Sequence, residues 1–273
     1  MGTRKEHDLI GEMELPTGAR YGIHAARARL NFPDRTPFHM EWYMALGLVK
    51  KACYQTAEAY EKAMVEKFGT TQGPEGVQGG INRLYPYLIH AAAEVAEGEH
   101  FEAFIVPAVS GGAGTSINMN INEIVANTAL LNMGERPGSY HLIDPVEHAN
   151  IFQSTNDVVP TALKVAVMLL FQELEAVINQ LRFSVEQIES AHNNDLRTGY
   201  TQMQEAVPTS YGKLFSTYSD ALSRDWWRVS KCFERIKTVN LGGGAVGTGM
   251  AVPRYFIMEA IGHLQTLTGL PVT

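Results

Sequence analysis

The sequence has little cysteine, no block of basic residues and no long hydrophobic run. Two cysteines in 273 residues give neither a disulfide framework nor a metal-binding quartet, which predicts a reducing compartment. The net charge of −7, with no cluster of Lys or Arg, argues against nucleic acid and anionic membrane as main partners. The apolar run over residues 165–171 is far shorter than the roughly 18 residues of a membrane span. The sequence therefore predicts a soluble, cytoplasmic protein.

Several familiar motifs are also missing. Residues 1–8 are charged and contain no apolar core, so they do not form a secretory signal. Gly242, Gly244 and Gly247 match G-x-G-x-x-G, but an amphipathic helix is expected before them where a dinucleotide site needs a strand. The nine histidines form no H-E-x-x-H motif and no Cys–His cluster. We expect neither a nucleotide site at these glycines nor a metal site.

The chain is rich in helical patterns instead. Residues 9–32 are expected to form turns and brief extended pieces, and helices are expected over about 36–68, 81–97, 161–192 and 210–237. The apolar positions of the third helix recur in steps of four and three and define what we call the apolar seam: Leu163, Val167, Leu170, Leu174, Val177, Leu181 and Ile188. A seam on a helix about 50 Å long requires a helical bundle or partner subunits to cover it. The prediction is a mostly α fold, with a mostly helical, mixed N-terminal domain over 1–150 and the first part of a long-helix bundle domain over 151–273.

The stretch from Gln153 to Thr161 is central to this prediction. Ser154, Thr155, Asn156 and Asp157 are residue types that cap helix N-termini, and Pro160 is expected in the first turn of the following helix. The free amides and the dipole of a helix start favour an anion there. For an isolated S-T-N-D, capping alone is the better explanation.

Two further stretches are rich in small hydroxyl and amide side chains. They are residues 111–122, which lead into another expected helix, and residues 201–204. Hydroxyl and carboxamide groups bind carboxylates through hydrogen bonds without a full countercharge. Packing or capping accounts for each stretch singly, whereas all three together predict a site for a small polyanion.

These three stretches resemble the signature segments of the aspartase/fumarase superfamily of lyases. The first carries G-G-A-G-T-S followed by N-M-N and N-E over residues 111–123, the second is Q-S-T-N-D over 153–157, and the third is Thr201-Gln202 followed by A-V-P. The likeness extends over nearly the whole chain. It implies the superfamily's fold and a site that binds a small dicarboxylate, with no cofactor and no metal.

Within that superfamily the details favour elimination of ammonia from L-aspartate to give fumarate. G-G-A-G-T-S is the aspartase form of the first segment, and Gln202 stands where fumarases carry His. Carried over residue by residue, the resemblance assigns Gln202 a place near the leaving amine. It assigns contacts with the substrate to Thr115, Ser116, Ser154, Thr155, Asn156 and Thr201.

Three departures keep alternatives open. Tyr200 stands where the family usually has Arg, Ser110 where aspartases often have Gln, and residues 144–148 read D-P-V-E-H in place of H/N-P-N-D-H. A fumarate hydratase, or a lyase for another succinate-type substrate, is therefore the alternative. A non-catalytic scaffold of the same fold is a third hypothesis.

The family's flexible loop with the serine base, G-S-S-x-M-P-x-K-x-N-P, occurs nowhere in the 273 residues. We therefore expect this chain to be the N-terminal portion of a longer protein and to be inactive alone. The family builds each active site from three subunits of a homotetramer, so the resemblance implies that subunits meet at the apolar seam.

Overall fold

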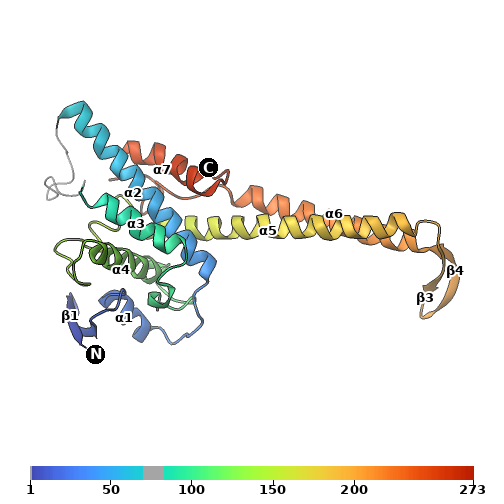
Figure 1. Ribbon diagram of the computed structural model, residues 1–273, viewed down its shortest axis with the longest axis horizontal. Helices are drawn as coiled ribbons and strands as arrows, with labels where there is room; N and C mark the ends of the chain where they lie inside the picture. The colour runs from blue at the N-terminus through green and yellow to red at the C-terminus, as the bar shows by residue number, and fades with distance from the viewer. Residues whose placement is uncertain (1, 70–82) are drawn as a thin grey trace. The chain divides into compact units, whose positions relative to one another are not determined.

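The computed structural model describes residues 2–69 and 83–273, and it is mostly α, as predicted (Figure 1). Contacts divide the chain into two compact units. Unit 1 comprises Met1–Ala166 and Thr238–Thr273, and unit 2 comprises Val167–Lys237. The domain boundary predicted near residue 150 refers to the whole protein and stays a prediction.

Unit 1 is a group of helices with one small hairpin. The hairpin strands β1 (Thr3–Asp8) and β2 (Gly11–Pro16) pair antiparallel, with Thr3 opposite Pro16. The helical elements are α1 (Ile23–Asn31), α2 (Met40–Phe68), α3 (Tyr85–Ala96), the 3₁₀ helix η2 (Phe101–Ala103), α4 (Thr115–Asn132), the beginning of α5 (Thr155–Ala191) and α7 (Arg254–Thr268). Helix α2 packs against α3 and α7, while α4 packs against α3 and α1 (Figure 1).

The core between these helices buries large aromatic side chains whose polar ends find partners. The phenol groups of Tyr43 and Tyr54, both on α2, donate hydrogen bonds of 2.6 Å to the carbonyls of Glu99 and Ala149. A buried tyrosine hydroxyl without such a partner would cost free energy. The residues that carry these carbonyls are thereby fixed against α2.

Helix α1 begins against two carboxylates that come from distant parts of the chain. Glu123 on α4 accepts hydrogen bonds from the backbone N–H groups of Gly22, His24 and Ala25 at 2.8 to 3.2 Å. Glu6 on β1 accepts a fourth, from Ile23, at 2.8 Å. Burial raises the pKa of Glu123 to about 8, although its three N–H donors act in the opposite direction. The first-turn amides of α1 are thus satisfied by tertiary contacts, because the helix has no local capping side chain.

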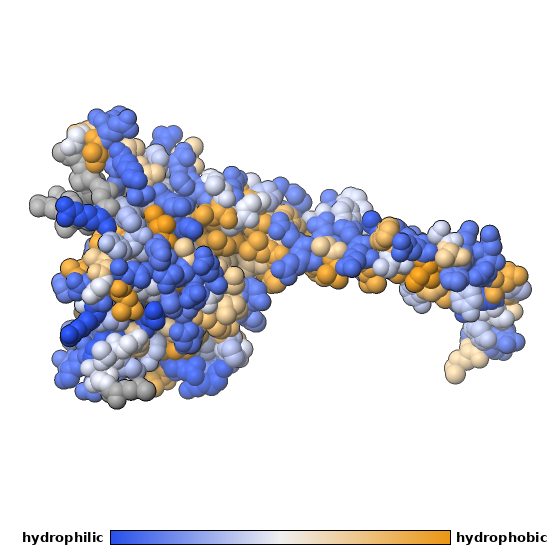
Figure 2. Space-filling view, viewed as in Figure 1, coloured by the Kyte–Doolittle hydropathy of each residue, from blue (hydrophilic) through white to orange (hydrophobic). Residues whose placement is uncertain are grey.

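Unit 2 contains the rest of α5, the strands β3 (Leu196–Thr201) and β4 (Gln204–Ser210), and α6 (Tyr211–Ile236). The two helices run antiparallel, because Ser219 donates to Glu189 at 3.1 Å and Trp226 to Glu175 at 2.6 Å. The seam residues Leu170, Leu174 and Val177 are 43 to 59% exposed, and apolar surface alternates with polar surface here (Figure 2). The periodicity predicted the helix correctly, but within this chain the seam is only partly covered.

The structure corrects several element boundaries. The 9–32 region contains helix α1, which the sequence analysis missed, as it missed α7 near the end of the chain. Helix α2 starts at Met40 and not at Thr36, because His39 is still extended, with φ −84° and ψ 130°. The helix predicted over 81–97 is α3, and residues 81 and 82, like the glycine-rich breaks over 73–80, lie outside the described residues. Across residues 2–69 and 83–273, no helix combines the length and the apolar character that crossing a membrane requires.

Candidate functional site

The beginning of α5 is built by a reciprocal cap. The backbone N–H of Ser154 donates to Asp157 Oδ1 at 2.9 Å, and Ser154 Oγ accepts from the N–H of Asn156 at 3.3 Å. The arrangement resembles a capping box, with Asp in the position usually held by Glu and with the Ser154 hydroxyl accepting from the second helical N–H in place of the third. Helix α5 therefore starts at Thr155, earlier than the predicted 161, and Pro160 lies inside it rather than in its first turn. The capping interpretation holds for Ser154 and Asp157, but it leaves Thr155 and Asn156 unexplained.

Thr155 takes part in a buried polar network instead of a cap. Its Oγ1 accepts a hydrogen bond of 3.2 Å from Asn118 Nδ2 on α4, and the same nitrogen lies 3.0 Å from Asn150 Oδ1. Among the described residues, the hydroxyl hydrogen of Thr155 has no acceptor. With an acceptor site already used, this hydroxyl remains available as a donor, which is the role that a carboxylate ligand requires.

Lys50 on α2 also belongs to this hydrogen-bond network. Its ammonium group is fully buried and donates to Gln153 Oε1 at 2.8 Å and to Asn150 Oδ1 at 3.2 Å. Burial lowers the pKa of Lys50 to about 7, and the nearby Cys53 and Asp157 oppose this shift. A buried amine with such a pKa is typical of functional sites as well as of structural networks.

Neither Lys50 nor Asn150 was predicted as a site residue from the sequence. Lys50 follows Leu46 by four residues and precedes Cys53 by three, so it occupies the same helical stripe as two fully buried residues. A lysine in the apolar stripe of an amphipathic helix was the available signal. The sequence offered no such signal for Asn150, because its hydrogen bonds depend on how α2 and α4 pack.

The glycine-rich loop over 241–250 is anchored to the same helix start. Gly244 N–H donates to Asp157 Oδ2 at 3.1 Å, Asn156 Nδ2 donates to the carbonyl of Ala245, and Asn240 N–H donates to Thr161 Oγ1 at 3.1 Å. Gly242, Gly244, Gly247 and Gly249 all have positive φ, a conformation that glycine adopts without strain. A pocket of about 510 Å³ lies between this loop and the helix, and Ser154 and Thr155 line it.

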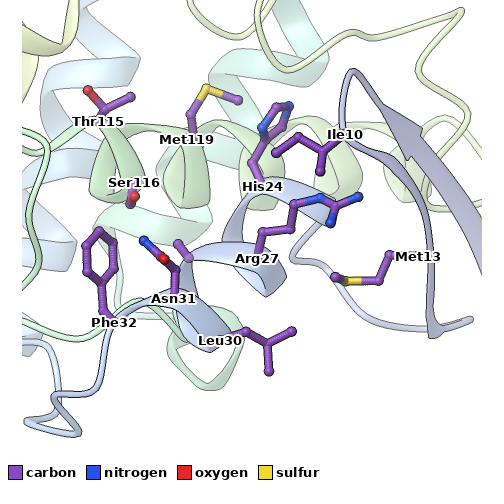
Figure 3. Close-up of a pocket in the computed structure, with 11 residues that line it drawn as sticks. Ile10, Met13, His24, Arg27, Leu30, Asn31, Phe32, Thr115, Ser116 and Met119 are labelled. Carbon is purple, nitrogen blue, oxygen red and sulfur yellow. The ribbon is translucent and has the colours of Figure 1, made fainter.

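Thr115 and Ser116 lie in the first turn of α4, after Gly114 at φ 86°. Thr115 is exposed, and its helix start has no side-chain cap. Both residues line a pocket of about 580 Å³, together with His24, Arg27 and Asn31 of α1 and residues of the hairpin (Figure 3). Arg27 is already paired with Asp8 at 2.7 Å, and this hydrogen bond holds the pKa of Asp8 below its ordinary value.

The predicted site residues of unit 1 are thus distributed over neighbouring surfaces. Thr115 and Ser116 line one pocket, Ser154 and Thr155 a second, and Asn156 a third of about 480 Å³ beside Gly114 and Val159. The Asn118–Thr155 hydrogen bond ties the two helix starts together. None of these three pockets contains all five side chains.

Thr201 and Gln202 belong to unit 2, at the tip of the β3–β4 hairpin. Thr201 pairs with Gln204, so Gln202 and Met203 form a two-residue turn in which both have positive φ, 52° and 63°. Such turns usually contain Asn or Gly. A non-glycine residue held in this conformation is strained and points to a functional constraint.

No group of three or more His, Cys, Asp or Glu side chains that could hold a metal ion occurs within residues 2–69 and 83–273. The donors gathered at the two helix starts are hydroxyls, carboxamides and backbone N–H groups. This donor set suits a small anion such as a carboxylate.

Comparison with known proteins gives consistent matches over the whole chain. A family model described as "Lyase" matches residues 11–273. The aspartate ammonia-lyase of Bacillus subtilis (strain 168) is 35% identical over 270 residues, which are 98% of this chain and 53% of that protein. The aspartate ammonia-lyase of Escherichia coli (strain K12) is 36% identical over 272 residues, with the same two coverages of 98% and 53%.

Solved structures give the same result for the fold. A structure described as a fumarate lyase:delta crystallin from Brucella melitensis bound to cobalt has a TM-score of 0.87 at 32% identity, over 100% of this chain and 56% of that one. A recombinant class II fumarase from Schistosoma mansoni has a TM-score of 0.84 at 26% identity, over 98% of this chain and 53% of that one. The chain spans about half the length of the curated relatives that it matches.

Proposed function

The chain belongs to the aspartase/fumarase family of lyases, and from this premise we propose that the whole protein is an aspartate ammonia-lyase. The reaction is an elimination that converts L-aspartate into fumarate and ammonia. The observation that carries the proposal is the Thr155 hydroxyl, which accepts from Asn118 and so keeps its hydrogen for a substrate carboxylate. The relatives named aspartate ammonia-lyase support the choice of substrate.

The residues of this chain bind and orient the substrate. Thr115, Ser116, Ser154, Thr155, Asn156 and Thr201 hold its carboxylates and amine through hydrogen bonds. When a base removes the proton from the carbon next to a carboxylate, the electron pair moves into that carboxylate and forms an enediolate-like intermediate. Donors fixed before the reaction stabilise this developing charge without reorganisation. The carbon–nitrogen bond then breaks, and ammonia leaves.

The two catalytic groups have different positions in this proposal. Gln202 lies near the leaving amine, where its carboxamide oxygen accepts an N–H hydrogen bond. The resemblance assigns the base to a serine on a loop that is not among these 273 residues. The reaction requires no cofactor.

A homotetramer is the proposed assembly of the whole protein, with subunits meeting at the apolar seam. The seam residues Leu163, Leu181 and Ile188 are 40 to 50% exposed in this chain. An exposed apolar stripe along a long helix is typical of a surface that another helix covers.

Fumarate hydratase is the second candidate. Its support is the class II fumarase among the similar structures and the departures at Tyr200 and Glu147. Tyr200 is 63% exposed beside the hairpin tip. A hydratase would use the same carboxylate donors but eliminate water.

The test is production of fumarate by the whole protein, followed by ultraviolet absorbance with L-aspartate or L-malate as the only substrate. We expect fumarate from L-aspartate and not from L-malate. Fumarate from L-malate alone would contradict the ammonia-lyase proposal and support the fumarate hydratase. If neither substrate is converted, the aspartate proposal is wrong and the scaffold hypothesis is favoured.

A further inference from the structure

Lys50 is the one lysine that the described core buries completely, and it does not form a salt bridge with any of the described residues. Its two acceptors are neutral amide oxygens, on Asn150 and Gln153. Burying a charge without a full countercharge is costly, so a buried lysine without one requires an explanation. Packing alone would be served as well by an apolar side chain of similar length.

The contacts lead from Lys50 to the proposed substrate donor in three hydrogen bonds. Lys50 Nζ donates to Asn150 Oδ1, Asn118 Nδ2 donates to that same oxygen, and Asn118 Nδ2 also donates to Thr155 Oγ1, at 3.2, 3.0 and 3.2 Å. Asn150 Nδ2 donates to the carbonyl of Gln153, and Lys50 also binds the Gln153 side chain. Lys50 therefore binds the segment before α5 at two residues, Asn150 and Gln153, which are also hydrogen-bonded to each other.

The orientation of two amides follows from this arrangement. Lys50 Nζ donates to the Asn150 side chain, so the oxygen of that amide, and not its nitrogen, faces Lys50. That oxygen then accepts from Asn118, which turns the Asn118 nitrogen towards Thr155. Each amide is fixed by its neighbour, and Thr155 is left as a donor.

We propose that Lys50 is a positioning residue of the dicarboxylate site, acting through Asn150 and Asn118 to hold the Thr155 hydroxyl as a carboxylate donor. This inference rests on the proposed function, since it needs a carboxylate at Thr155. Lys50 is not a catalytic residue, because two side chains separate it from Thr155.

The charge of Lys50 is also coupled to ligand binding. Burial lowers the pKa of Lys50 to about 7, so burial favours the neutral amine near this pH. The charged group that acts on it is Asp157 of α5. The thiol of Cys53, on the same helix as Lys50, stays neutral because burial raises its pKa, and α4 and the segment before α5 present the neutral amides named above. A dianion bound at Thr155 favours the charged form, and therefore raises this pKa and draws a proton into the protein.

The experiment is calorimetric titration of the whole protein with fumarate near pH 8, in buffers of different ionisation enthalpy. These buffers report the protons taken up for each fumarate bound. We expect the wild type to take up a fraction of a proton that approaches one. Lys50→Met is expected to bind fumarate on the order of tenfold more weakly and to take up no such proton, because Gln153 Oε1 loses its donor and Asn150 Oδ1 loses one of its two donors.

Lys51→Met is the matched control, because it removes the neighbouring, partly exposed lysine of the same helix. It should retain the affinity and the proton uptake of the wild type. Wild-type affinity and proton uptake in Lys50→Met would overturn the proposal. If Lys50→Met does not fold, Asn118→Ala decides, since wild-type fumarate affinity in that variant would overturn the route from Lys50 to Thr155.

A second pair of variants tests the route of the effect. Asn118→Ala and Lys50→Met should be non-additive, because both disconnect the same hydroxyl. Additive losses in the double variant would overturn the route through Asn118.

The outcomes also separate this inference from the proposed function. If fumarate binding depends on Lys50 but L-aspartate is not converted, the ammonia-lyase proposal fails and the positioning role stands. If the wild type converts L-aspartate and Lys50→Met binds fumarate normally, the ammonia-lyase proposal stands and the positioning role of Lys50 fails. No fumarate binding by the wild type would overturn both.

Discussion

Thr155→Val is expected to lower kcat/KM of the whole protein for L-aspartate by about 100-fold or more, the usual effect of removing one preorganised donor to a developing oxyanion. Valine matches threonine in shape, so helix α5 is retained while the hydroxyl is lost. The side chain would no longer donate to a substrate carboxylate or accept from Asn118. Steady-state kinetics of the purified variant measures the effect.

Thr161→Val is the matched control for this prediction. Thr161 is fully buried on the same helix, and its Oγ1 accepts from Asn240 N–H at 3.1 Å. The same chemical change should therefore reduce the free energy of unfolding by about 1 to 3 kcal/mol and leave kcat/KM unchanged. Equal kinetic losses in both variants would show that Thr155 acts only through stability.

Gly47→Ala is expected to have the largest effect on folding, lowering the free energy of unfolding by about 2 kcal/mol or more. A Cβ at Gly47 would lie 2.8 Å from both Ala96 Cα and the carbonyl carbon of Val95, which are backbone atoms at the end of α3. Helix propensity favours alanine by about 1 kcal/mol, but overpacking of a rigid contact typically costs about 1 to 3 kcal/mol and sometimes more. Since backbone cannot rotate away, we expect the overpacking to dominate.

Gly262→Ala tests the same change without the contact. Gly262 lies inside α7, and a Cβ there would have no neighbour within 4 Å. This variant should gain up to about 1 kcal/mol. Urea unfolding of both variants measures the difference, and a gain in Gly47→Ala similar to that in Gly262→Ala would contradict the close approach of α2 and α3.

Periodicity predicted the long helices well, because one face of each is apolar over many turns. The helices predicted over 161–192 and 210–237 correspond to α5 at Thr155–Ala191 and α6 at Tyr211–Ile236. The start of α5 was placed too late because residues 154–157 were read as preceding the helix. Only Ser154 does so, and Asp157 caps from within.

Helix α1 could not be predicted from local sequence. It is short, and its first-turn amides are satisfied by Glu123, about a hundred residues further along the chain. The same limit applied to the site. The motifs identified Thr115, Thr155 and Gln202, whereas the support that Lys50 and Asn150 provide depends on how α2, α4 and the segment before α5 pack.

The interpretation of the S-T-N-D stretch shows how capping and ligand binding can share one helix start. Ser154 and Asp157 form the cap, while Thr155 faces the Asn118 network and the pocket beside the glycine-rich loop. From the sequence alone, capping and ligand binding were competing interpretations of this stretch. In the structure, capping is observed and leaves the Thr155 hydroxyl free for the proposed ligand.

The most direct test of the central claim is a crystal structure of the whole protein with fumarate bound. The account predicts a carboxylate oxygen at about 3 Å from Thr155 Oγ1, with the Asn118 and Lys50 contacts unchanged. Fumarate bound only beside Arg27 in the pocket of Figure 3, with no contact to Thr155, would contradict it.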